Sequence, residues 1–245
     1  MRYLLVNLNN TRTKFLLADK AKGLQGQETA LVTAELTPES LKAAISDWDY
    51  DHAVLASVVP DKSKLIRELM GTTPLVEVSH QIELGVTVDF PQPQSVGADR
   101  LANAAAVVDR CREQPVIVVD FGTAVTFDIV DQRPAYVGGV IAPGLDSMRD
   151  YLHRRTALLP KIEISRPESA IGKSTEAAMQ VGAYHGYRGL IREIVSQIEK
   201  ELGERAKIVA TGGYAELIAA DLEFIESVEP LLTMDGLLRI AKLNF

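Results

Sequence analysis

The sequence predicts an α/β fold of two lobes that share a duplicated β-hairpin. Strand-like and helix-like patterns alternate along the chain, and its 245 residues are enough for two hydrophobic cores. Residues 4–19, "LLVNLNNTRTKFLLAD", and residues 116–131, "VIVVDFGTAVTFDIVD", repeat one order: an apolar strand, a polar residue, a tight turn containing Thr, and a second strand ending on Asp. We place the lobe boundary between Gln114 and Pro115, which gives lobes 1–114 and 115–245.

The first lobe continues from its hairpin with alternating helices and strands. Thr37 is a good N-cap and Pro38 suits the first helical position, so a helix begins there. Gly71 closes a second helix, and Gly97 opens an alanine-rich one. The expected elements are a helix at 37–48, a strand at 52–59, a helix at 61–71, a strand at 74–79 and a helix at 97–113.

The second lobe opens with its own hairpin and ends in helices. Pro115 introduces the apolar strand of that hairpin, and a long helix with many small residues follows later in the chain. The expected elements are two strands within 116–131, a strand with turns at 136–144, helices at 145–155 and 174–202, a strand at 207–213, and helices at 215–220 and 235–243.

Composition excludes several classes of protein. Hydrophobic residues make up 47% of the chain and charged residues 24%, as in ordinary globular proteins. The net charge of -7 argues against nucleic-acid binding, which needs Lys and Arg to neutralise phosphates. The single cysteine, Cys111, allows neither an internal disulfide nor a zinc site, and no apolar run approaches the ~20 residues of a membrane span. We therefore expect a cytoplasmic protein that binds no nucleic acid and no membrane.

The two hairpin turns have the residue types of phosphate-binding turns. In the register of the repeat, Asn7 matches Asp120 and Asn9 matches Gly122, and each turn holds a Thr. Short turns with Gly or Asn present backbone N–H groups to anions, and Asn tolerates a positive φ better than other non-glycine residues. Two such turns, one from each lobe, suit a nucleotide triphosphate gripped from both sides, although each alone is equally consistent with a plain β-hairpin.

Two further short segments carry residues of chemical interest. "GADR" places Asp99 and Arg100 at a helix start, where the carboxylate can accept a proton from a hydroxyl and the guanidinium can pair with a substrate carboxylate. The alternative is an acidic first helical turn with a solvated arginine. "ATGG", residues 210–213, ends a strand on bare glycine backbone that can admit an adenosine ring, but an ordinary strand-to-helix turn has the same residues.

Taken together, the segments "NLNNTRTK", "GADR", "VDFGTAVTFD", "GGVIAPG", "TALLP", "IGKST" and "ATGG" resemble type III pantothenate kinase, the Bvg accessory factor family, across nearly the whole chain. That family belongs to the superfamily of acetate and sugar kinases, Hsp70 and actin. The resemblance implies two duplicated ribonuclease-H-like lobes with a nucleotide cleft between them. It also implies ATP-dependent phosphorylation of pantothenate to 4'-phosphopantothenate, the first step of coenzyme A biosynthesis, with Mg²⁺ and a monovalent cation, K⁺ or ammonium.

The resemblance assigns a role to each motif residue. It implies ATP binding by Asn7, Leu8, Asn9, Asn10, Thr11, Arg12, Thr13, Lys14, Thr123, Gly212 and Gly213. It implies pantothenate binding by Phe90, Gly97, Ala98, Asp99, Arg100 and Thr175, with Asp99 as the catalytic base and Asp120 as the ligand of the monovalent cation. Ser174 is the better N-cap of the long helix, next to Thr175. The family also forms homodimers through the long helix, so we expect a dimer.

Three positions depart from the family pattern. Asn7 replaces an aspartate, Asn9 replaces a glycine, and Phe90 replaces a tyrosine and so loses its hydroxyl. At a separation of about 4 Å and an effective dielectric near 20, one charge pair is worth roughly 4 kcal/mol, so losing the charge of the aspartate that Asn7 replaces slows turnover by about a hundredfold or more. An alternative is therefore a catalytically weak or silent family member that acts as a binding or regulatory protein. A sugar kinase is disfavoured by Asp99, Arg100 and Thr175.

Overall fold

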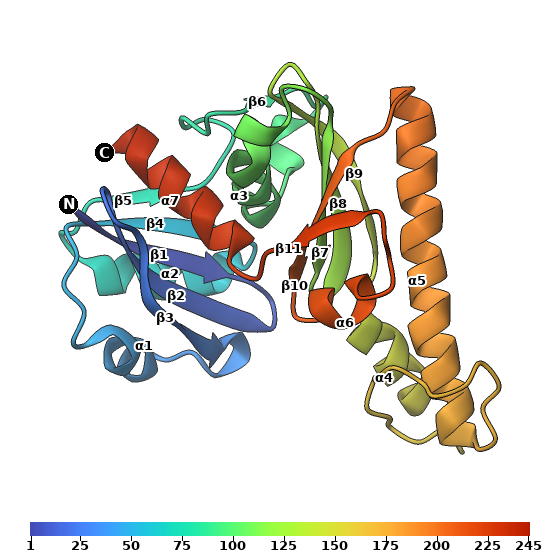
Figure 1. The fold of residues 1–245 in the computed structure, drawn as a ribbon. Coiled ribbons are helices and arrows are strands. Elements are labelled where there is room, and N and C mark those ends of the chain that lie inside the picture. Colours follow the sequence, from blue (N-terminus) through green and yellow to red (C-terminus); the bar gives the residue numbers. More distant parts are fainter. The chain divides into compact units, whose positions relative to one another are not determined.

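The computed structural model describes residues 1–245 and divides into two compact units (Figure 1). The first unit comprises Met1–Arg112, Val130–Gly138 and Leu231–Phe245, and the second comprises Glu113–Ile129 and Gly139–Pro230. The expected lobes 1–114 and 115–245 differ from these packing units mainly at the C-terminus, because the last helix packs on strands of the first sheet. The division into lobes by sequence stays a prediction.

The first unit is built around a five-stranded sheet with the order β3-β2-β1-β4-β5. Strands β1 and β2 form the expected hairpin, and β1 pairs in parallel with β4. The strands are β1 (Arg2–Leu8), β2 (Arg12–Asp19), β3 (Gly23–Val32), β4 (His52–Ser57) and β5 (Leu75–Glu77), and the helices are α1 (Pro38–Ile45), α2 (Pro60–Met70), α3 (Ala98–Val107) and α7 (Leu232–Asn244). Short 3-10 helices lie at Thr33–Glu35, Pro93–Ser95 and Val108–Arg110.

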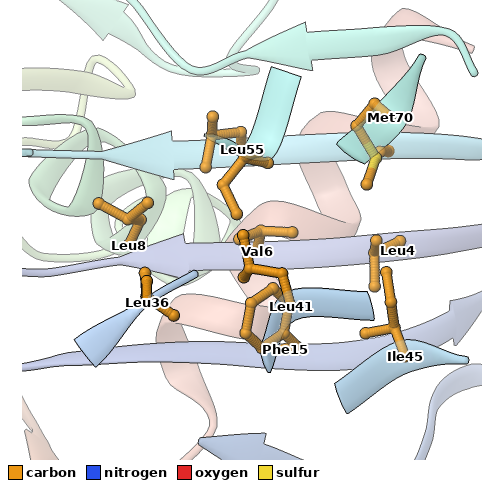
Figure 2. Packing of buried hydrophobic residues seen from close by; sticks show 11 residues of the cluster. Leu4, Val6, Leu8, Phe15, Leu36, Leu41, Ile45, Leu55 and Met70 are labelled. Carbon is orange, nitrogen blue, oxygen red and sulfur yellow. The ribbon is translucent and has the colours of Figure 1, made fainter. Parts of the chain in front are cut away.

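One face of this sheet packs against α1 and α2. Figure 2 shows Leu4, Val6 and Leu8 of β1 in a line of buried side chains that the apolar side chains of both helices cover. Each fully buried Leu or Val contributes roughly 1.5–3 kcal/mol to folding, so this cluster is a main source of stability. Because side chains alternate along a strand, residues 3, 5 and 7 of β1 point to the opposite face. That is the face where α7 contacts β1 and β4.

Helices α3 and α7 approach each other unusually closely. A Cβ atom at Gly236 would lie 1.9 Å from the carbonyl oxygen of Ala102, so only glycine fits there. Beside this contact, the buried hydroxyl of Thr233 donates a hydrogen bond to Oδ1 of Asn103 at 2.8 Å. This packing holds α3, whose first turn carries Asp99, against α7 within the first unit.

The second sheet has the order β11-β10-β7-β8-β9-β6. Its elements are β6 (Thr87–Val88), β7 (Val116–Phe121), β8 (Ala124–Val130), β9 (Ala135–Pro143), β10 (Lys207–Gly212) and β11 (Ile225–Val228), with helices α4 (Leu145–Arg155), α5 (Thr175–Leu202) and α6 (Ala215–Ala219). Read from β9 to β11, its strands repeat the order of the first sheet, and β7 pairs in parallel with β10 as β1 does with β4. The predicted duplication of a hairpin-led α/β unit is confirmed.

Three strands were not predicted. Strand β3 is a half-exposed edge strand rich in Gly, Gln and Glu, and β6 and β11 are two and four residues long. None of them has the apolar run or the alternation that marks a strand in a sequence. The alanine-rich helix is also shorter than expected, since its α-helical part ends at Val107 and continues as a 3-10 turn.

Candidate active site

The first predicted phosphate turn joins β1 to β2 and carries two unsatisfied amide oxygens. Asn7 is the penultimate residue of β1 and is 5% exposed. Its Oδ1 atom and that of Asn9 are buried and lack a hydrogen-bond partner. A buried unpaired polar group costs roughly 1–3 kcal/mol, so a ligand that pairs with these oxygens stabilises the turn. Oxygen atoms are the ligands that Mg²⁺ prefers, and an amide oxygen also accepts hydrogen bonds from water bound to the metal, so this pair suits a hydrated metal on a phosphate.

The turn is fastened to the end of β3. The hydroxyl of Thr33 donates to the backbone oxygen of Asn9 at 2.6 Å and lies 2.9 Å from the hydroxyl of Thr13. The Thr33 backbone N–H donates to the carbonyl of Thr11 at 3.0 Å. Lys14 pairs with Glu28 of β3 at 3.0 Å. These contacts hold the turn in one shape without help from a ligand.

The eight consecutive residues predicted to bind ATP do not occupy equivalent places. The side chain of Leu8 lies in the core and Thr13 is fully buried, so side-chain contact with a nucleotide falls to the exposed part of the turn. Asn10, Thr11 and Arg12 are exposed there. The expected positive φ at Asn9 is not found: neither Asn9 nor its counterpart Gly122 has a positive φ. The turn is ordinary backbone, so Asn9 fits without strain.

The predicted base lies at the start of α3. Asp99 is in the first helical turn, and its Oδ1 accepts a hydrogen bond from the Arg100 backbone N–H at 2.8 Å. Burial raises the pKa of the Asp99 carboxyl above its ordinary value, and the Arg100 N–H and charge offset part of that rise. A Cβ at Gly97 would lie 2.7 Å from Asp99 Oδ1. The absence of a side chain at Gly97 therefore makes room for the carboxylate.

The phosphate turn and the start of α3 meet at the same edge of the first sheet. The carbonyl of Leu8, the last residue of β1, accepts a hydrogen bond from the Val58 N–H at 3.1 Å. The same Val58 has its Cγ1 atom 3.5 Å from the Cβ position of Gly97. One residue after β4 thus lies against both segments, and brings the Asn7 turn and Asp99 into one region of the first unit.

An aromatic and cationic group lies beside the predicted base. The ring of Phe90 meets the ring of Tyr136 edge-on, with centroids 6.3 Å apart and planes at 61°. The guanidinium carbon of Arg100 lies 5.7 Å from the centroid of the same Tyr136 ring. Phe90 and Arg100 were predicted as substrate-binding residues and the structure brings them together. Tyr136 was missed; its position before the glycine pair of "YVGG" was the only signal.

In the second unit, glycines frame the predicted cation ligand. Asp120 is the penultimate residue of β7, as Asn7 is of β1, and it lies opposite Thr211 of β10. Gly212 has a φ of +93°, and a Cβ there would lie 2.6 Å from Asp120 Oδ1 and 2.6 Å from the Phe121 nitrogen. Only glycine therefore fits beside the carboxylate. This places the predicted residues Asp120 and Gly212 in direct proximity, with Gly213 next in the chain.

Helix α4 braces the turn that contains Thr123. The Thr123 carbonyl accepts hydrogen bonds from the Gly144 N–H at 3.2 Å and the Ser147 hydroxyl at 2.9 Å. Tyr214, which follows the glycine pair, donates its hydroxyl to Asp146 at 2.6 Å. Burial, together with Asp146, raises the pKa of Tyr214 to about 12, so the phenol stays a donor. The start of α4 thus connects the two turns of this unit that were predicted to bind ATP.

Thr175 begins α5, and its neighbour Ser174 is the N-cap, as expected. The Ser174 hydroxyl accepts a hydrogen bond from the Ala177 N–H at 3.1 Å. Thr175 is exposed and makes no cap of its own, so its hydroxyl stays available in its predicted role.

No group of three or more His, Cys, Asp or Glu side chains is arranged to hold a metal ion. No helix has the length and hydropathy needed to cross a membrane.

Fold and site together define a class of protein. Two sheets of one strand order, each with a short polar turn after its first strand, form the duplicated α/β fold that the sequence predicted, and a partly buried carboxylate beside an arginine is the kind of group that a small-molecule kinase uses. Solved structures agree on the fold. A Baf family transcriptional activator from Campylobacter jejuni has a TM-score of 0.59 at 19% identity, covering 98% of this chain and 96% of that one. The activator of 2-hydroxyisocaproyl-CoA dehydratase from Clostridium difficile, with bound ADPNP, has a TM-score of 0.55 at 11% identity, covering 100% and 94%.

Sequence comparisons identify the family. The family model described as type III pantothenate kinase matches residues 3–197. Curated type III pantothenate kinases from Akkermansia muciniphila and Methylacidiphilum infernorum are 47% and 39% identical to this chain. The first match covers 100% of both chains, and the second covers 98% of this chain and 88% of the relative. The chain belongs to the type III pantothenate kinase family, as its motifs predicted.

Proposed function

We propose that this chain transfers the terminal phosphoryl group of ATP to the primary hydroxyl of pantothenate and so forms 4'-phosphopantothenate and ADP. The observation that carries this proposal is the partly buried Asp99 carboxylate, held beside Arg100 at the edge of the sheet where the Asn7 turn lies. Full-length identity of 47% to a pantothenate kinase supports the choice of acceptor.

Asp99 acts as the general base. As the hydroxyl oxygen of pantothenate bonds to the terminal phosphorus, the bond from that phosphorus to the bridging oxygen of ADP breaks and the hydroxyl proton passes to Asp99. The raised pKa of Asp99 brings its basicity closer to neutral pH than that of an exposed aspartate. Arg100 pairs with the carboxylate of pantothenate, with the backbone of Gly97 and Ala98 and the Phe90 ring around it.

The β1–β2 turn binds the phosphates of ATP through its backbone N–H groups; Lys14, which pairs with Glu28, follows the turn on β2. Bound Mg²⁺ neutralises charge on the phosphates and eases attack on the terminal phosphorus. Asn7 and Asn9, whose Oδ1 atoms have no partner, are the residues of this turn that would hold the hydrated metal. Within the second unit, taken by itself, Thr123, Gly212 and Gly213 are the residues that would bind a nucleotide, and Asp120 would hold K⁺ or ammonium.

We also propose a homodimer through the α4–α5 region and a location in the cytoplasm. Large apolar side chains are exposed at the end of β9, on α4 and in the segment that joins α4 to α5. They are Ile141, Tyr151, Leu152, Leu158 and Ile171, with exposed fractions between 42% and 90%. Light scattering tests the dimer: the wild type has twice the monomer mass, and Leu158→Asp lowers it. A monomeric wild type contradicts this part.

A direct assay tests the reaction. Purified protein with ATP, Mg²⁺ and pantothenate is expected to form phosphopantothenate, seen by mass spectrometry, with stimulation by K⁺ or ammonium. Asp99→Asn is the matched control, since it keeps shape and removes the base; it is expected to lose about 10²–10⁴-fold in turnover. Failure of the wild type at high enzyme concentration, with pantothenate binding intact, would instead support a silent binding or regulatory protein, the alternative motivated by Asn7.

A further inference from the structure

A buried tyrosine lies between the two side chains that we assign to the acceptor. Tyr136 is 0% exposed, at the second residue of β9. Arg100 places its guanidinium carbon 5.7 Å from the centroid of the ring, and Phe90 meets the ring edge-on at 6.3 Å. A guanidinium within about 6 Å of an aromatic centroid is attracted by the ring quadrupole, and edge-to-face rings prefer this separation. One ring thus contacts both substrate-side residues.

The segment that carries Phe90 is attached to Tyr136 through the backbone. Strand β6 pairs in parallel with β9, where Val88 lies opposite Tyr136. The N–H of Asp89 then donates to the carbonyl of Tyr136 at 2.9 Å. Phe90 is the next residue, so its ring can reach the Tyr136 ring only while this pairing holds. A Cβ atom at Gly138, two residues after Tyr136, would lie 3.9 Å from Cε2 of Phe90, which is an ordinary van der Waals contact.

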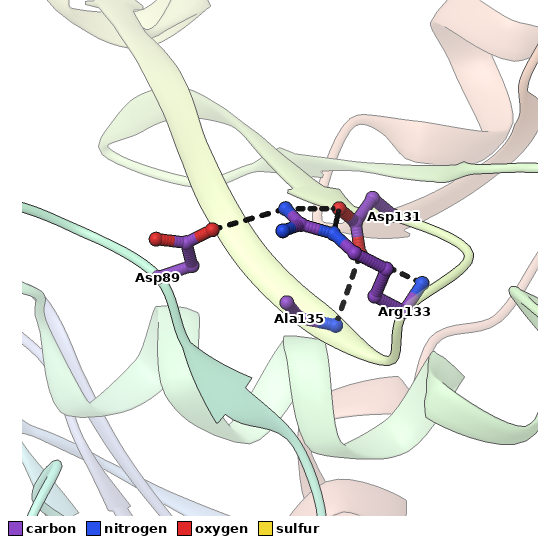
Figure 3. Close-up of polar contacts among 4 residues, drawn as sticks. All are labelled: Asp89, Asp131, Arg133 and Ala135. Carbon is purple, nitrogen blue, oxygen red and sulfur yellow. Dashed lines mark hydrogen bonds and ion pairs between the residues drawn. The ribbon is translucent and has the colours of Figure 1, made fainter.

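A surface ion-pair group, which we call the surface clamp, also joins the segment of Phe90 to the turn before β9. Figure 3 shows Arg133 between two carboxylates: it donates to Asp131 at 2.7 Å and to Asp89 at 3.0 Å. Asp131 also accepts from the N–H groups of Arg133 and Ala135, which shapes the turn before β9. The Arg133 and Asp89 side chains are 70% and 58% exposed, and exposed ion pairs are weak. The clamp is therefore a minor restraint, and the buried ring is the main one.

We propose that Tyr136 is a positioning residue for pantothenate recognition, which holds the Arg100 guanidinium in the orientation that pairs with the acceptor carboxylate. The proposal rests on the proposed function. Because Tyr136 is fully buried, its hydroxyl does not replace the one lost at Phe90; it acts through its ring. Recognition of the carboxylate end of the acceptor then depends on an aromatic side chain that acts through Arg100.

Two substitutions at one position separate ring from hydroxyl. Tyr136→Leu removes the ring and is expected to raise KM for pantothenate about tenfold, the factor that a partly desolvated cation–π contact supplies. Tyr136→Phe keeps the ring and is expected to stay within about twofold of the wild type. KM for ATP changes in neither variant. If the phenylalanine variant loses as much as the leucine variant, the ring is not the cause and the proposal is wrong.

A double-mutant cycle shows whether the effect passes through Arg100. In an Arg100→Gln background, Tyr136→Leu is expected to change KM for pantothenate less than twofold, since no guanidinium is left to position. Full additivity of the two substitutions overturns the proposal. Thermal melts check folding, and Tyr136→Met, which fills more of the space, replaces the leucine variant if that one unfolds. Calorimetric titration with pantothenate repeats the cycle without turnover, so an inactive wild type refutes the proposed function but not this inference.

Discussion

Gly97→Ala is expected to lower turnover by displacing the catalytic carboxylate while leaving the fold intact. The new Cβ would lie 2.7 Å from Asp99 Oδ1, whereas its next neighbours, on Val58 and Arg100, are at 3.5 and 3.7 Å. Gly97 has a φ of -59°, which alanine adopts without strain. The one serious overlap is therefore with the end of a movable side chain, and moving that side chain is the cheapest response.

The geometry gives the size of the effect. Ordinary contact begins near 3.4 Å, so the Asp99 oxygen must move by about 0.7 Å. Misplacing a reacting group by 1 Å can cost about a hundredfold in rate, so kcat is expected to fall about 10- to 100-fold. Loss of glycine at the N-cap position costs a fraction of a kcal/mol to about 1 kcal/mol, which lowers the melting temperature by only a few degrees.

Steady-state kinetics of ADP release, with a thermal melt of the same preparation, check this expectation. KM for ATP serves as the internal control, because Gly97 does not contact the β1–β2 turn. The double variant with Asp99→Asn is the decisive comparison: once the base is gone, Gly97→Ala has nothing left to displace and adds no further loss. An unchanged kcat, or an equal loss in the Asp99→Asn background, would refute the reasoning.

Three further predictions concern pH, packing and the metal. Burial raises the pKa of Asp99, and only the ionised carboxylate is a base. In a pH profile, kcat is therefore expected to begin its fall towards acid at a pH above the usual aspartate pKa of about 3.9. A fall centred at or below that pH contradicts the prediction. Gly236→Ala forces a Cβ to 1.9 Å from the Ala102 carbonyl and is expected to lower the free energy of unfolding by about 1–3 kcal/mol in a denaturant titration; an unchanged free energy of unfolding contradicts the close packing of α3 on α7. Asn7→Asp buries an unpaired charge, so its melting temperature is expected to fall without Mg²⁺ and ATP and to recover with them; equal melts with and without them would count against metal binding there.

The duplicated fold could be predicted from the sequence because it depends on patterns of neighbouring residues. The two hairpins repeat a residue order, and helix signals such as Thr37 and Pro38 act within a few residues; Thr37 does form a reciprocal capping box with Ser40. Strand β3 could not be predicted, because a half-exposed edge strand does not need the apolar side chains by which a strand is found in a sequence. The placement of α7 with the first unit was not readable either, since it depends on contact between Gly236 and Ala102, far apart in the chain.

The site divides in the same way. Asp99 and Arg100 were predicted because adjacent residues carry their chemistry in a short motif. Tyr136 was missed because its role arises only when β6 pairs with β9 and brings Phe90 to it from 46 positions earlier in the chain. Motifs therefore name the groups that meet a ligand, whereas the residues that hold those groups in place follow from tertiary packing.

The duplication also explains why Asn7 is tolerated. Asn7 and Asp120 occupy the same place, the penultimate residue of the first strand, in two sheets of one strand order. At Asp120 the missing side chain of Gly212 leaves space beside the carboxylate, whereas Asn7 is 5% exposed with no partner for its Oδ1. A carboxylate at position 7 would be a buried, unpaired charge in the absence of metal and so more costly than the unpaired amide. Asparagine thus makes the ligand-free turn more stable than aspartate would, but it offers no negative charge to a bound metal. Active sites commonly exchange catalytic power for stability in this way.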